Sequence, residues 1–175
     1  MSNAYVACMS SRRRIAHAML ASALAATVMA LTIAPSALAA QNGNGQTLTS
    51  SLKRGLDPAG QLLTIKGKGF NPAVGIYVAL CVTPAQGAKP GPCGGGIDMD
   101  GSSQASAWIS SNPPPYARNL TTPYGKKGSF TTRIKVSPKI GDVDCRAVSC
   151  SIVARADHLQ GADRRYDVAI PVSFR

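Results

Sequence analysis

Residues 143–152 read Val-Asp-Cys-Arg-Ala-Val-Ser-Cys-Ser-Ile, a short loop closed by Cys145 and Cys150. A longer loop, between Cys81 and Cys93, precedes it in the chain. A fifth cysteine, Cys8, lies in the N-terminal stretch that is expected to be removed. The other four can pair in three ways, and the pairing Cys81–Cys93 with Cys145–Cys150 is favoured because each bond then closes a short loop. Disulfides persist outside reducing compartments, so the sequence predicts a small exported domain held by two local disulfides.

The N-terminus has the pattern of an export signal. Arg12-Arg13-Arg14 precede an apolar, alanine-rich stretch from Ile15 to Ala34, and Ala37-Leu38-Ala39 then form a small-x-small cleavage site. We expect residues 1–39 to be a signal peptide that is removed by cleavage before Ala40. A permanent membrane anchor is the alternative, since the apolar stretch is nearly long enough to span a bilayer. The arginines fit both the general secretory route and the twin-arginine route.

The rest of the chain has the pattern of one all-β domain. Residues 40–46 are expected to form a flexible N-terminal segment, and residues 47–175 the domain. Six stretches rich in β-branched residues are expected to be strands: 47–53, 62–65, 76–82, 129–136, 150–155 and 167–174. Because each short strand has one apolar face to bury, the pattern predicts a β-sandwich, with Pro171 at an edge or a bulge.

One stretch, residues 84–122, breaks this regularity and is expected to be a long loop. Loops of this length in small domains are uncommon unless they bind something or are disordered. The stretch contains the only tryptophan of the chain, Trp108, together with Tyr116, and Tyr124 follows soon after. Amphipathic aromatic side chains on a disulfide-closed loop are favourable ligand contacts. The alternative is that Trp108 fills the core of the sandwich.

The chain is basic, with a formal net charge of +11. Removal of the signal peptide takes away three arginines and no acid, which leaves +8. The alternation Arg133-Ile134-Lys135 predicts a strand with its charges in solvent and Ile134 inside. A basic exported domain can adhere to an anionic cell envelope or, nonspecifically, to nucleic acid. No aromatic-studded basic stripe indicates specific nucleic-acid recognition, so the charge serves solubility first.

The inventory of catalytic groups is thin. Once the signal peptide is removed, His158 is the only histidine, and the chain has no glutamate. A secreted hydrolase would have to use Asp157 and His158, which otherwise form a turn or a surface pair at the end of a strand. Asp98 and Asp100 begin a calcium-loop pattern without the later carboxylate that completes it, so no metal or cofactor is predicted. The sequence therefore favours a non-catalytic binding protein.

Several pieces of the chain, taken in their order, resemble a known family. They are residues 62–70, Cys81 with Cys93, residues 128–136, Cys145 with Cys150, and residues 168–174. The chain resembles the neocarzinostatin-like apoproteins that actinomycetes secrete. The resemblance implies a seven-stranded immunoglobulin-like β-sandwich with a cleft on one side, in which family members sequester an enediyne antibiotic that attacks DNA.

The chain departs from that family where ligand contacts are expected. Family members have an aromatic residue two positions after the first cysteine, where this chain has Thr83. They have a phenylalanine a few residues after the second cysteine, where this chain has Ile97 and Asp98. The aromatic-rich hairpin before the second disulfide is absent, because only residues 137–144 separate Val136 from Cys145. We therefore expect a secreted or envelope-associated monomer with a divergent cleft for an apolar small molecule or a cell-envelope component. The candidate contacts are Trp108, Tyr116, Tyr77, Thr83 and Tyr124.

Overall fold

Strand β3 (Gln61–Lys68) shows how the alternation in the sequence becomes a layer of the fold. Leu63 and Ile65 are fully buried, whereas Leu62 and Lys66 are exposed. Successive side chains of a strand point to opposite faces, so β3 covers a core with one face and meets solvent with the other. The computed structural model describes residues 39–42, 44–95 and 101–175, and the expected signal peptide, apart from Ala39, lies outside these residues.

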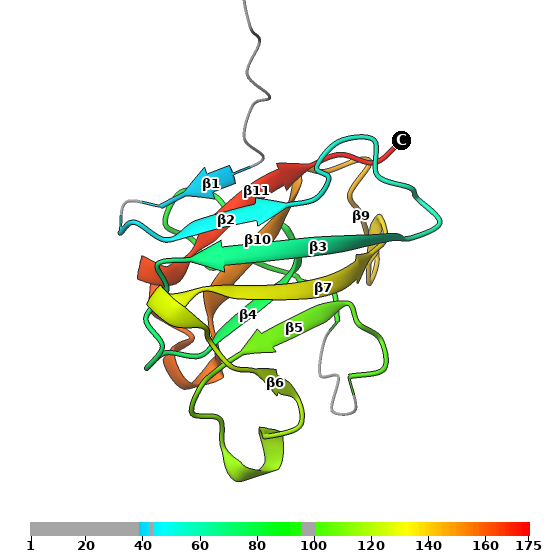
Figure 1. The fold of residues 1–175 in the computed structure, drawn as a ribbon. Helices are drawn as coiled ribbons and strands as arrows, with labels where there is room; N and C mark the ends of the chain where they lie inside the picture. Colours follow the sequence, from blue (N-terminus) through cyan, green and yellow to red (C-terminus); the bar gives the residue numbers. More distant parts are fainter. Residues whose placement is uncertain (1–38, 43, 96–100) are drawn as a thin grey trace, which may run out of the picture. The chain divides into compact units, whose positions relative to one another are not determined.

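Two sheets lie face to face (Figure 1). The first has four antiparallel strands in the order β1 (Ala39–Gln41), β2 (Thr47–Ser50), β3 and β7 (Phe130–Val136). The second has five strands in the order β11 (Val168–Val172), β10 (Cys150–Ala156), β4 (Ile76–Val82), β5 (Ser106–Ile109) and β6 (Thr121–Thr122). A small hairpin, β8 (Lys139–Ile140) and β9 (Val143–Asp144), precedes Cys145.

The core fills the space between the two sheets. Leu63 and Ile134 from the first sheet pack in one cluster with Val78, Ile152 and Ile170 from the second, and all five are at most 2% exposed. Burial of this apolar surface is the main force that holds the layers together. The all-β sandwich predicted from the sequence is confirmed. Of the described strands, seven have four or more residues, which is the number that the family resemblance implies.

Both predicted disulfides are present. Cys81 is bonded to Cys93, and Cys145 to Cys150. Pro171 lies on β11, an edge strand of its sheet, as expected for a residue without an N–H group to donate. Among the described residues, no helix is long and apolar enough to cross a membrane.

Two expectations differ from the structure. The stretch 84–122 is not a continuous loop, because it contains β5, the 3-10 turn η1 (Pro115–Ala117) and β6. Residues 40–46 are not wholly unpaired either, since β1 begins at Ala39 and pairs with β2. Both segments lack a long alternation of apolar and polar residues. The local sequence pattern therefore does not predict that they pair with neighbouring strands.

Candidate functional site

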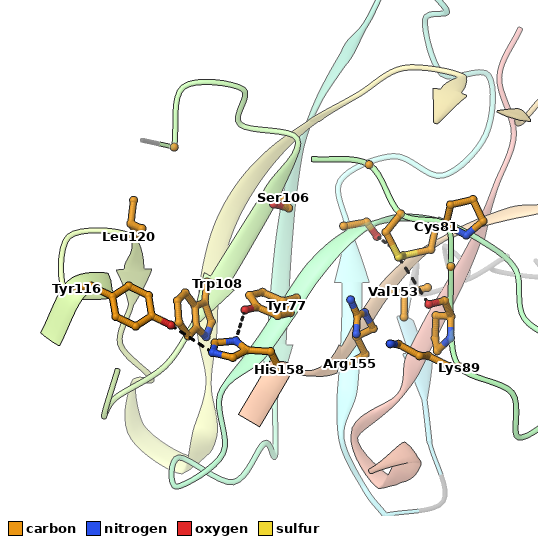
Figure 2. A pocket seen from close by; sticks show the side chains of 17 residues that line it. Tyr77, Cys81, Lys89, Ser106, Trp108, Tyr116, Leu120, Val153, Arg155 and His158 are labelled. Atoms are coloured by element: carbon orange, nitrogen blue, oxygen red, sulfur yellow. Dashed lines mark hydrogen bonds between the residues drawn. A yellow bond between two sulfur atoms is a disulfide. The ribbon is translucent and has the colours of Figure 1, made fainter. Parts of the chain in front are cut away.

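A half-open cleft of about 870 Å³ lies on the five-stranded sheet, on the face turned away from the core (Figure 2). Its lining comes from β4, β5 and β10, from the loop that ends at Cys93, and from η1 and η3 (His158–Gln160). A volume of this size is typical of small-molecule sites. The same three strands thus cover the core with one face and build the cleft with the other.

The floor of the cleft is apolar. Alternation along β4 sends Ile76, Val78 and Leu80 into the core and places Ala79 in the cleft lining. Val153 from the neighbouring strand β10 lies beside it, in a second apolar cluster that also contains Cys81. Cys93 packs on this cluster, so the disulfide fixes the 83–93 loop against the floor.

One end of the cleft is aromatic. Tyr77 on β4 pairs in register with Trp108 on β5, and their ring centroids are 5.4 Å apart. His158 lies edge-on to the indole at 5.3 Å and stacks on Tyr77 at 6.1 Å. Tilted and edge-to-face arrangements of this kind are favourable for aromatic rings. The three rings form a wall, in which Tyr77 and Trp108 are fixed by strand pairing and His158 is carried by η3.

The indole of Trp108 is held by a buried carboxylate. Trp108 Nε1 donates a hydrogen bond to Asp157 Oδ2 at 3.0 Å, and Asp157 is 1% exposed. The other oxygen, Oδ1, accepts from the backbone N–H of Leu159 at 3.0 Å and caps η3. Gly75 leaves the room that this contact needs, because a Cβ there would collide with Asp157 Oδ2.

Two tyrosine hydroxyls hold the imidazole of His158. Nδ1 lies 2.6 Å from the Tyr77 hydroxyl, and Nε2 lies 3.3 Å from the Tyr116 hydroxyl. Tyr116 is carried by η1 and is 60% exposed, so it reaches over the cleft from outside the sheet. Figure 2 shows Tyr116, His158 and Trp108 grouped at this end.

The other end of the cleft is cationic. Arg155 extends from β10, and its guanidinium carbon lies 5.6 Å from the centroid of the Tyr77 ring. Lys89, which is exposed, enters the lining from the 83–93 loop. Figure 2 shows both cations on the Cys81 side, away from Tyr116. Among the lining residues that the structure describes there is no aspartate.

Burial alters the acidity of a phenol in the cleft. Desolvation, followed by the negative charge of Asp157, raises the pKa of Tyr77 above its ordinary value of 10.0. Tyr77 therefore stays a neutral hydroxyl at physiological pH, able to exchange a hydrogen bond with His158.

The structure brings together three of the five candidate contacts. Trp108, Tyr116 and Tyr77 line the cleft. Thr83 does not, and its Oγ1 lies 2.8 Å from Ser151 Oγ. Tyr124 does not either, because its hydroxyl donates to Val74 O at 3.0 Å and its ring packs on Phe130. Trp108 is 9% exposed and lies on strand β5, in the cleft lining and outside the main core cluster.

The pair Asp157 and His158 is not arranged as an acid–base dyad. The carboxylate is engaged by Trp108 and Leu159, whereas the imidazole is engaged by tyrosines. The carboxylate thus positions the indole, and the imidazole belongs to the aromatic wall. The calcium pattern at Asp98 and Asp100 lies outside the described residues, and among those that are described no group of three or more metal-binding side chains occurs.

Sequence reasoning missed Arg155, Lys89 and Val153 as parts of the site. Alternation along 150–155 already placed Val153 and Arg155 on one face. No pattern in the sequence indicated that this face is covered by the Cys93 loop and η1, because that depends on contacts between distant segments.

No family model matches the chain. Among curated proteins, the chain is similar to "Thiamine biosynthesis protein X" of Corynebacterium glutamicum, at 29% identity over 116 residues. The match covers 66% of this chain and 56% of that protein, so the chain spans little more than half of the relative's length. Among solved structures, it is similar to macromomycin, at 20% identity and a TM-score of 0.48, over 75% of this chain and 100% of that one.

Proposed function

We propose that the protein is an exported, non-catalytic binding protein that holds an apolar, aromatic small molecule in the cleft. The observation that carries the proposal is the composition of the cleft, with an apolar floor at Ala79 and Val153 and an aromatic wall at Tyr77, Trp108 and His158. Binding pockets combine such apolar linings with a few placed polar groups. The two disulfides support export, since such bonds persist in oxidising compartments.

The cleft geometry also supports binding over hydrolysis. Catalysis by Asp157 and His158 needs the carboxylate to orient the imidazole, but the carboxylate is buried and bonded elsewhere. A ligand ring can instead stack against the wall, with Tyr116 closing over it. An enediyne chromophore is one member of this ligand class.

The experiment uses the single tryptophan as its reporter. The protein is purified from its native secretion, co-purifying small molecules are identified by mass spectrometry, and Trp108 fluorescence is followed as each is added back. Because the matched relative is named for thiamine biosynthesis, thiamine and its phosphate esters are included.

Two variants test whether the ligand lies in the cleft. We expect Tyr116→Ala to weaken ligand binding. Leu62→Ala, which changes an exposed residue on the other sheet, is the matched control and is expected to leave ligand binding unchanged. Binding that survives Tyr116→Ala and leaves Trp108 fluorescence unaltered would refute a site in the cleft.

A second candidate function, adhesion to a polyanion, is favoured by the outer face of the four-stranded sheet. Lys66 and Lys68 on β3 and Arg133 and Lys135 on β7 are all exposed on this face. In the register of the two strands, Lys66 lies opposite Thr131, and Arg133 lies opposite Thr64. The two lysines of β3 therefore occupy one half of the strand pair and the two cations of β7 the other half, with one cation at every second residue position along the pair. None of the four forms an ion pair with a described residue.

Duplex DNA is a suitable probe for this second function. If each cation neutralises one phosphate, the logarithm of the association constant for DNA falls with the logarithm of the salt concentration with a slope of about −3 to −4. Changing all four cations to glutamine is expected to bring the slope close to zero and to leave ligand binding in the cleft intact. A slope that is unchanged in this variant contradicts adhesion through this face.

A further inference from the structure

The two ends of the cleft differ in chemistry, and this difference constrains the ligand beyond its being apolar. The aromatic end is formed by Trp108, His158 and Tyr116, and the opposite end holds the side chains of Arg155 and Lys89 (Figure 2). Tyr77 connects the two ends, since its ring centroid lies 5.4 Å from that of Trp108 and 5.6 Å from the guanidinium carbon of Arg155.

Neither cation of the cleft forms an ion pair with a described residue, although the guanidinium of Arg155 lies over the Tyr77 ring, 5.6 Å from its centroid. The ion pairs among the described residues use other arginines and lysines. Of the described acids, Asp157 bonds the indole, and Asp167, whose charge interacts with that of Arg155, already pairs with Arg164 at 2.8 Å. Two like charges that share a partly enclosed apolar space repel each other, and an anion between them relieves the repulsion.

We propose that the cleft selects an amphipathic organic anion, with an aromatic body against Trp108 and a carboxylate, sulfonate or phosphate group at Arg155 and Lys89. This inference rests on the cleft being the binding site and adds the charge and the orientation of the ligand. An arginine supplies a planar set of donors that matches such oxyanions, and a partly desolvated charge-assisted hydrogen bond is stronger than a neutral one.

Two fluorescent probes separate charge from aromatic binding. 8-Anilinonaphthalene-1-sulfonate and N-phenyl-1-naphthylamine share an aromatic body, but only the first carries a sulfonate. Each is titrated into the folded protein, and energy transfer from Trp108 reports whether it lies in the cleft. We expect the sulfonate to bind at least tenfold more tightly than the neutral probe, with an advantage that shrinks as salt is added.

Variants test which residues carry the preference. In the double variant Arg155→Gln/Lys89→Gln, the ratio of the two Kd values is expected to shift at least tenfold toward the neutral probe. The control Arg133→Gln/Lys66→Gln removes the same charge from the opposite face and is expected to leave the ratio unchanged. Melting curves of every variant exclude sulfonate binding to partly unfolded protein.

The outcomes separate the two proposals. If both probes bind in the cleft equally well, or if the control moves the ratio as much as the double variant, the anion preference is wrong while the binding site stands. If neither probe shows energy transfer from Trp108, and Tyr116→Ala changes neither titration, the proposed function itself is overturned.

Discussion

At the scale of single residues, the site depends on a buried contact between Trp108 and Asp157. The carboxylate is enclosed, and its two oxygens accept from the indole N–H and from the Leu159 N–H. If a buried oxygen loses its hydrogen-bond donor, the free energy of removing that oxygen from water is no longer offset by a hydrogen bond. Gly75 is part of the same contact because any side chain there would meet the carboxylate. The contact therefore couples the shape of the cleft to the stability of the domain.

Substitution of Trp108 is expected to destabilise the domain in two steps. Trp108→Phe keeps an aromatic ring but removes the donor to Asp157, at a cost of about 1–3 kcal/mol. Trp108→Ala also removes the buried ring, at a cost of about 3–5 kcal/mol. Denaturant unfolding measures both. Tyr116→Ala is the control, and because Tyr116 is 60% exposed its unfolding free energy should change by less than about 0.5 kcal/mol. An unfolding free energy that Trp108→Phe leaves unchanged would show that the hydrogen bond contributes nothing.

At the scale of elements, the two disulfides have different tasks. Cys81–Cys93 spans 12 residues and ties the 83–93 loop to β4 at the floor of the cleft. Cys145–Cys150 spans five residues and closes the turn between β9 and β10, away from the cleft lining. The first bond therefore shapes the site, and the second stabilises a turn.

Removing each disulfide separately is expected to distinguish these tasks. By loop length, Cys81→Ala/Cys93→Ala costs about 3 kcal/mol and Cys145→Ala/Cys150→Ala about 2 kcal/mol. Only the first variant should also lose ligand binding, because it frees the loop that carries Lys89. Binding and thermal unfolding are measured under conditions in which both variants remain folded. Loss of binding in both variants to the same extent contradicts this division.

The segment 84–122 shows what local pattern reveals about an element and what it misses. Its turn-forming residues predicted an interruption, and the 83–93 loop and η1 are indeed irregular. Strand β5 has only four residues and was missed, because its identity as a strand comes from pairing with β4 in the register Tyr77 to Trp108. Such pairing joins residues 31 positions apart, which no local window contains.

At the scale of the whole molecule, two tyrosines make stability depend on alkaline pH. Burial, and then the charge of Asp157, raise the pKa of Tyr124 far above its ordinary value of 10.0, and the pKa of Tyr77 rises for the same two reasons. In the unfolded chain both phenols ionise near pH 10, whereas in the folded state they keep their protons. Their stabilisation is therefore fully present below pH 10 and is lost as the pH rises toward the folded-state pKa.

Tyr124→Phe is expected to flatten this alkaline loss of stability. The variant loses its hydrogen bond to Val74 at neutral pH, at a cost of about 1 kcal/mol, but it has no phenol to ionise on unfolding. The slope of the unfolding free energy between pH 9 and pH 11 is the measured quantity. Leu62→Ala serves as the comparison, since this exposed side chain carries no ionisable group and should leave the slope as it is. An unchanged slope in Tyr124→Phe removes this tyrosine as the cause.

Export is a prediction for the whole chain that the described residues leave untested. The cleavage site at Ala37-Leu38-Ala39 predicts a secreted protein that begins at or near Ala40. Intact-mass analysis of the culture supernatant measures the N-terminus. Recovery of only the uncleaved chain, in membranes, would favour the anchor instead.

The amino-acid sequence by itself determined the fold class, the disulfide pairing and most strands. These properties follow from local quantities: the two-residue alternation of apolar side chains and the short spacing between cysteines. Trp108 and Tyr116 were also named from the sequence, because they lie on the stretch 84–122 that breaks the regular strand pattern.

Only the tertiary structure decided which of those residues form one site. The cleft joins β4, β5, β10, η1 and η3, and its indole is held by a carboxylate 49 positions away in the chain. It also left Thr83 and Tyr124 outside the cleft lining and placed Arg155 and Lys89 in it. The physical reason is that a cleft on the outer face of a sheet exists only where distant segments pack over it, and that packing depends on strand order, register and disulfide closure together.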